Sequence, residues 1–100
     1  MSAAYRLTPR AAADLDELLD HYLREAGADV CERVAAEFER NLQLLAANRH
    51  LGHRRDDLVA DPVRFWTVFS YFVIYYPDED PVLVARIVHA HRELRSIVVD

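Results

Sequence analysis

The sequence predicts an α+β domain in which a helical hairpin packs on one face of an antiparallel sheet, in the order β-α-α-β-β-β. Two amphipathic segments fill the first half of the chain, and three apolar runs rich in aromatic and β-branched residues fill the second half. A layer of helices on a sheet buries both sets of apolar residues. The length of 100 residues suits one core, so residues 1–100 are expected to form a single domain.

The chain is expected to begin with a short strand at residues 5–7, followed directly by a helix. Thr8 and Pro9 predict the start of that helix, because Thr is a good N-cap and Pro is favoured at the first helical position. Apolar residues at three-to-four spacing continue to Ala26, with acidic residues on the other face. Gly27 is expected to end the helix.

A second helix is predicted immediately after Gly27. Asp29, followed three residues later by Glu32, resembles a capping box that opens this helix. The short link predicts that the two helices form an antiparallel hairpin. The apolar stripe of the second helix contains Val30, Val34, Phe38, Leu42 and Leu45.

The second half of the chain is predicted to form three strands. Residues 48–61 show no periodicity and are expected to form a loop, and turn-forming residues at 78–81 predict a hairpin. Residues 92–98 are expected to form a short terminal helix or a tail. The predicted strands span residues 63–68, 71–76 and 82–89.

Alternation along the second of these strands predicts that both faces of the sheet are apolar. One set of side chains points one way and the other set points to the opposite face. The helical hairpin is expected to cover one face, and an open second face would mark a partner site. Alternatively, a terminal helix that starts at Arg92 folds back over it. The two sets are Tyr71, Val73 and Tyr75, and Phe72, Ile74 and Tyr76.

The charge pattern bears on the partners of the chain. Seventeen acidic residues oppose twelve basic residues, which gives a net charge of −5 and disfavours nucleic acid as the direct target. Residues 1–47 contribute about −4 and residues 48–100 about −1, so the helices are expected to be the more acidic part. No run of 18 apolar residues and no secretory signal is present, and Cys31 has no partner for a disulfide. We therefore expect a cytoplasmic protein that does not enter membranes.

The order of these elements, a Gly-Arg loop and the final strand together resemble the ParE/RelE toxin superfamily over residues 5–94. The final strand reads Val-Ala-Arg-Ile-Val-His-Ala-His-Arg-Glu-Leu at positions 84–94, similar to the ending of ParE-type toxins. The resemblance implies the toxic half of a bacterial type II toxin–antitoxin pair. In RelE-like toxins an arginine stands where Tyr71 stands here, and a tyrosine often stands at the position of Ala90. These departures favour the ParE-like branch.

A ParE-like toxin is implied to inhibit DNA gyrase, to have no enzymatic activity of its own, and to form a hetero-oligomer with a ParD-like antitoxin. The alternative is a RelE-like ribosome-dependent mRNA endonuclease, whose chemistry would be carried by His89, His91, Arg64 and Arg92. A third possibility is a chain that has lost toxicity and only binds its antitoxin or regulates transcription with it.

Three sets of residues are candidate sites. His50, His53, His89 and His91 lack the spacing of a strong zinc motif, so no metal and no cofactor are expected. The residues predicted to bind the target are Arg54, Arg55, Arg64, Arg86 and Arg92. Alternatively, these arginines form ordinary surface ion pairs with Asp56, Asp57, Asp61 and Glu93. The residues predicted to bind the antitoxin are Trp66, Phe69, Tyr71, Val73 and Tyr75.

Overall fold

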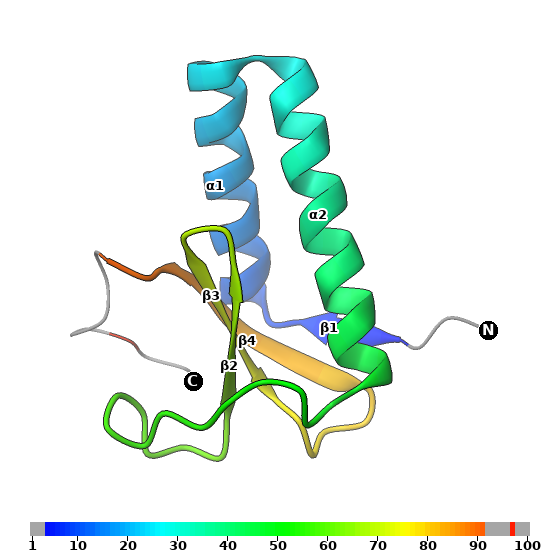
Figure 1. Ribbon diagram of the computed structural model, residues 1–100, viewed down its shortest axis with the longest axis vertical. Helices are drawn as coiled ribbons and strands as arrows, with labels where there is room; N and C mark the ends of the chain where they lie inside the picture. The colour runs from blue at the N-terminus through cyan, green and yellow to red at the C-terminus, as the bar shows by residue number, and fades with distance from the viewer. Residues whose placement is uncertain (1–3, 92–96, 98–100) are drawn as a thin grey trace.

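The computed structural model describes residues 4–91 and residue 97, and it contains two helices packed on a four-stranded mixed sheet (Figure 1). The sheet order is β1-β4-β3-β2, so β1 and β2 lie at the edges. The predicted fold class and element order are confirmed, while the predicted terminal helix at 92–98 falls almost wholly outside the described residues. The elements are β1 (Tyr5–Leu7), α1 (Pro9–Ala26), α2 (Ala28–Ala47), β2 (Arg64–Val68), β3 (Tyr71–Tyr76) and β4 (Val82–His89).

The two helices are joined by one residue. As predicted, Thr8 caps α1, because its hydroxyl accepts a hydrogen bond from the Ala11 N–H at 3.0 Å. Gly27, at φ 90°, ends α1 and also precedes the first residue of α2. The predicted capping box at Asp29 is therefore wrong: Asp29 already lies in the first turn of α2, whose N-cap makes no side-chain hydrogen bond.

The helical hairpin covers one face of the sheet and forms the larger core with it (Figure 1). Phe38 and Leu42 of α2 are each 1% exposed, and Val73 and Tyr75 of β3 are fully buried against the same core. This agrees with the predicted stripe on α2 and with the predicted grouping of Val73 and Tyr75 on one face of β3. The apolar side chains that α2 contributes to this core share one face of the helix because they recur at its 3.6-residue period.

Strand β1 lies parallel to β4, whereas the sequence predicted an antiparallel sheet. Tyr5 pairs with Val82 and Leu7 with Val84, while β3 runs antiparallel to both β2 and β4. A strand of three residues shows the same alternation in either direction, so its sequence does not specify orientation. Because β1 ends at Leu7, the remainder of the β4 edge has no strand beside it among the described residues. That part of the edge is where α1 contacts β4.

The second face of the sheet also carries a core, and the chain itself covers it. Residues from the loop before β2 pack on this face together with Ile97, so the prediction that this face is open to a partner is wrong. The loop runs beneath the sheet in Figure 1, as the irregular segment between α2 and β2. The buried members of this core are Val59, Val63, Phe65, Ile74, Ala85 and Val88.

An irregularity in β4 determines which of its residues face the helices. The register between β3 and β4 shifts at Ile74 and Tyr75, so that Ile74 pairs with Arg86 and Tyr75 with Val84. Ala85 consequently belongs to the second core, whereas Ile87 belongs to the helix-side core.

Neither helix among the described residues is long and apolar enough to cross a membrane.

Candidate functional site

Two of the predicted target-binding arginines are held in local ion pairs. Arg54 bonds Asp56 at 2.7 Å and Arg55 bonds Asp57 at 2.9 Å, each through the guanidinium and a carboxylate two residues further on. All four side chains are substantially exposed. Exposed pairs of this kind contribute only about 0–1 kcal/mol to stability. The arginines therefore remain at the surface, where a stronger acidic partner can displace the local one.

Arg64 has a structural role at the start of β2. Its Nη1 donates to the carbonyl oxygen of Gly52 at 2.6 Å and to that of His50 at 3.3 Å, which ties the loop to the sheet. Gly52 in turn donates its N–H to the Tyr75 hydroxyl at 2.8 Å. A Cβ at Gly52 would lie 2.8 Å from both the Phe65 carbonyl oxygen and that hydroxyl, so no larger residue fits.

Arg86 is buried, which contradicts its predicted role in target binding. Its side chain is 5% exposed and forms a two-pronged ion pair with Asp14 of α1, with Nε 2.7 Å from Oδ2. The same Oδ2 accepts the backbone N–H of Ile87 at 3.0 Å. Asp14 thus accepts one backbone N–H on the part of the β4 edge that lies beyond β1, and Arg86 neutralises the partly buried carboxylate.

The arginines predicted to bind the target do not gather at one place among the four that the structure describes. Arg54 and Arg55 lie in the loop, Arg64 is bound to loop carbonyls at the start of β2, and Arg86 is directed to α1. Arg92 lies outside the described residues. Of the predicted arginines that the structure describes, only Arg54 and Arg55 therefore remain available to an acidic target.

The five predicted antitoxin-binding residues divide into buried and accessible ones. Val73 and Tyr75 have no exposed surface, because the helical hairpin covers their side of β3, so their predicted contact with a partner is wrong. Trp66 and Tyr71 are partly buried at the margin of the same core. Phe69 is 54% exposed and is the most accessible large apolar side chain in the described chain.

Phe69 has an unusual backbone conformation for its residue type. It occupies the two-residue turn between β2 and β3 with φ 55°, a region that glycine adopts easily and an aromatic residue rarely does. Its ring lies 6.1 Å from that of Phe38, which in turn lies 6.0 Å from the ring of Tyr71. The turn therefore presents a strained aromatic residue to solvent beside the hairpin core.

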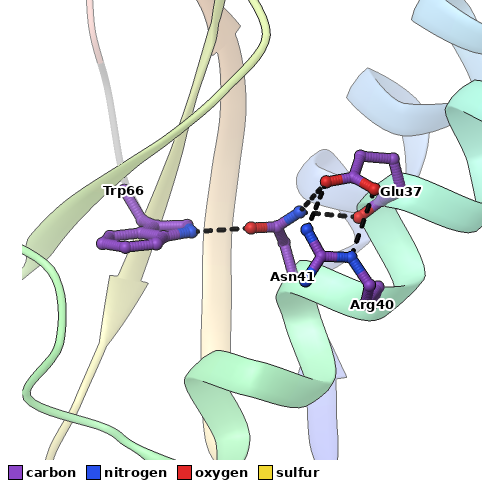
Figure 2. Close-up of polar contacts among 4 residues, drawn as sticks. All are labelled: Glu37, Arg40, Asn41 and Trp66. Atoms are coloured by element: carbon purple, nitrogen blue, oxygen red, sulfur yellow. Dashed lines mark hydrogen bonds and ion pairs between the residues drawn. The ribbon is translucent and has the colours of Figure 1, made fainter.

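Trp66 is fixed by a polar chain that the sequence analysis did not identify (Figure 2). Its indole Nε1 donates to Asn41 Oδ1 at 2.9 Å, and Asn41 Nδ2 donates to the Glu37 carbonyl oxygen at 2.8 Å. Arg40 bonds the Glu37 side chain, which lowers the pKa of that carboxyl. Asn41 is buried, and only its place within the apolar stripe of α2 could have drawn attention to it. These hydrogen bonds hold the Trp66 ring in one orientation on the edge strand β2.

A pocket of about 300 Å³ lies between α1 and the adjoining ends of β3 and β4. His89, a candidate acid or base in the endonuclease alternative, lies in this pocket, and its Nδ1 accepts the His91 N–H at 3.2 Å. The ring of His89 also contacts that of Tyr71 edge-on, with centroids 5.2 Å apart. Other residues that line the pocket include Asp14, Glu17, His21, Tyr22, Arg24, Ser70 and Tyr71.

The residues of the endonuclease alternative are not all together. Arg64 pairs with Tyr75, whereas His89 pairs with Tyr71, four residues away on the same strand and hence about 13 Å away along the sheet. Arg92 lies outside the described residues. No group of three or more metal-ligating side chains is found within residues 4–91 and 97, so the four histidines considered above form no such group there.

Comparisons with known proteins agree with this architecture. A family model described as "ParE toxin of type II toxin-antitoxin system, parDE" matches residues 5–94. A chain in the solved structure titled "Chromosomal ParDE TA system from P. aeruginosa" is similar in fold, with a TM-score of 0.74 and 22% sequence identity. The match covers 90% of this chain and 98% of that chain. No curated protein matches the sequence.

Proposed function

Because the chain belongs to the ParE toxin family of type II toxin–antitoxin systems, we propose that it inhibits DNA gyrase and is neutralised in the cytoplasm by a ParD-like antitoxin. The family match over residues 5–94 is the observation that carries this proposal. On this proposal the toxin acts by binding and does not catalyse a reaction. Its partners are the antitoxin, with which it forms a hetero-oligomer, and gyrase.

The accessible aromatic residues at the β2–β3 turn are the proposed antitoxin surface. Phe69 is exposed, and Trp66 and Tyr71 lie partly open beside it. Aromatic residues anchor many interfaces because they bury a large area at a small cost in side-chain entropy. The strain at Phe69 supports a role in binding, since a turn selected for stability alone would carry glycine there.

Arg54 and Arg55 are the proposed contacts with gyrase, together with Arg92. The two loop arginines are exposed and, within the described residues, form ion pairs only with neighbouring acids, which an acidic surface of the target can replace. Arg64 and Arg86 are omitted from this set, because their guanidinium groups hold the loop and the β4 edge in place. The target itself is inferred from the family and not from any feature of these side chains.

The endonuclease alternative is less well supported by the arrangement of its residues. A ribonuclease of this type needs a group that activates the 2′-hydroxyl and a cation that stabilises the phosphoryl transition state at the same site. Arg64 on β2 pairs with Tyr75 and His89 on β4 pairs with Tyr71, toward opposite ends of β3, and Arg64 is bonded to backbone carbonyls. These two residues do not form one reaction centre.

The proposal is tested by two assays on the purified chain, one for DNA supercoiling by gyrase and one for cleavage of mRNA on programmed ribosomes. We expect inhibition of supercoiling and intact mRNA. The double variant Arg54→Gln, Arg55→Gln should inhibit less, whereas Arg10→Gln, which removes one exposed charge from α1, should match the wild type. Cleavage of mRNA that disappears in His89→Ala would instead establish the endonuclease.

A further inference from the structure

The pocket between α1 and the sheet has aromatic walls on two sides. On α1, the rings of His21 and Tyr22 meet edge-on with centroids 5.6 Å apart. On the sheet, Tyr71 and His89 form a second edge-on pair at 5.2 Å. All four residues line the pocket. Aromatic rings attract cations through the negative potential of their faces, and planar guanidinium groups also stack on them.

The pocket also contains a carboxylate that has no partner in the described chain. Asp14 is bonded to Arg86 and the Ile87 N–H, and Arg24 is paired with Asp20 at 3.1 Å. Glu17 forms no hydrogen bond or ion pair within residues 4–91 and 97, although it lines the same pocket. With the histidines neutral, the charged groups that line the pocket therefore leave one negative charge without a compensating partner among residues 4–91 and 97.

We propose that this pocket binds the side chain of an arginine from the antitoxin, with Glu17 as the carboxylate and the tyrosine rings as the walls. The part of this inference that names the antitoxin rests on the function proposed above. An arginine suits the pocket better than a lysine, because its planar group both stacks on aromatic rings and bonds a carboxylate. The charge of the helical part of the chain, about −4 over residues 1–47, favours the approach of a basic segment.

The chemistry of the pocket is tested without the antitoxin, by nuclear magnetic resonance on the full chain. The probe is N-acetyl-arginine methylamide, and the control is the citrulline analogue, which has nearly the same shape and no charge. We expect saturable shifts at His21, Tyr22, Tyr71 and His89 with the arginine probe. Affinity should fall by about fivefold with citrulline and in the Glu17→Gln variant.

A matched variant separates this site from a general charge effect. Glu25→Gln removes an exposed carboxylate from the same helix outside the pocket, and it should bind the arginine probe as the wild type does. Absence of saturable shifts at the pocket, or equal binding of the citrulline analogue, would overturn the proposal. Because the probe assay requires neither gyrase nor an antitoxin, failure of the proposed function would leave this result unaffected.

The identity of the occupant is tested with the antitoxin encoded beside the toxin gene. Its affinity for Glu17→Gln should be at least fivefold lower than for the wild type, and Glu25→Gln should show no loss. Replacement of one particular antitoxin arginine by glutamine should cause the same loss and have no further effect on Glu17→Gln. Equal affinity of the antitoxin for the wild type and for Glu17→Gln would overturn the assignment.

Discussion

The two faces of the sheet are both apolar and both buried, but they are covered by different kinds of structure. On one face, regular helices present a periodic stripe that includes Phe38 and Leu42. On the other face, the loop before β2 supplies Val59 and Val63, and Ile97 packs beside them. The comparison shows that an apolar face predicts burial and does not say whether a partner or the chain itself provides the cover.

The most exposed large apolar side chain among the described residues lies at the margin between the two faces. Phe69 stands at the turn of the β2–β3 hairpin, next to the helix-side core and outside the loop. The partner surface of this toxin is therefore inferred to be small and aromatic at the turn, with the adjoining pocket at Tyr71 and His89. Substitutions on the two faces and at this margin distinguish stability from binding.

The largest effect is expected in the helix-side core. Phe38→Ala should lower the free energy of unfolding by about 3–5 kcal/mol, because it leaves a cavity among buried side chains. Toxicity and antitoxin binding should both be lost. Urea denaturation measures the change, with Leu23→Ala, at a 49% exposed position of α1, as the control that stays near the wild type. A loss below 1 kcal/mol for Phe38→Ala would contradict this assignment of the core.

The second prediction concerns the contact between α1 and the edge of β4. Asp14→Ala should destabilise by about 3 kcal/mol, since it leaves the Arg86 guanidinium buried without its carboxylate and the Ile87 N–H without its acceptor. Asp16→Ala, at an exposed position two residues away, is the control in the same urea titration. If both variants behave alike, the ion pair does not hold α1 to the sheet.

The second face should respond less strongly than the first. Val63→Ala should cost about 2 kcal/mol, because the side chain is 2% exposed beneath the sheet but smaller than Phe38. Val59→Ala, at a slightly more exposed position in the same core, should cost less. An effect near zero at both positions would mean that the loop is not a stable cover, and a partner on this face would again be required.

The stability of the chain at alkaline pH tests the contact of Tyr5 with Glu39 on the helix side, without a substitution in the core. Partial burial and the hydrogen bond to Glu39 raise the pKa of Tyr5 from 10.0 to about 12. Between these values the unfolded chain loses the Tyr5 proton and the folded chain retains it, so stability is full below pH 10 and declines toward pH 12. The decline should be shallower in Tyr5→Phe. The other four tyrosines of the chain are the same in both proteins, so equal slopes would show that Tyr5 does not contribute.

The smallest effect on stability is expected at Phe69. Phe69→Gly should change the free energy of unfolding by less than about 1 kcal/mol, because relief of the positive φ offsets the loss of the ring contact with Phe38. Its affinity for the antitoxin should nevertheless fall at least about tenfold. Leu51→Ala is a control at another exposed apolar position, where affinity should be retained. Unchanged affinity in Phe69→Gly would remove the turn from the antitoxin surface.

The sequence by itself determined the elements and their order. The spacing of apolar residues located both helices, Thr8 and Pro9 marked the start of α1, and the strand predicted at 71–76 agrees with β3 in the structure. The alternation along β3 also grouped its side chains correctly into two faces, but it did not say that the Val73 face meets the helices and the Ile74 face meets the loop. These features follow from periodicity and capping, which act over a few neighbouring residues.

Only the tertiary structure decided which residues meet across the chain. Asp14 and Arg86 are 72 positions apart, and nothing near Arg86 in the sequence distinguishes a buried ion pair from a surface cation. The same holds for the bond from Trp66 to Asn41 and for the loop that covers the second face. Such contacts depend on the packing of whole elements, including the parallel β1 and the irregularity in β4, and local patterns do not encode it.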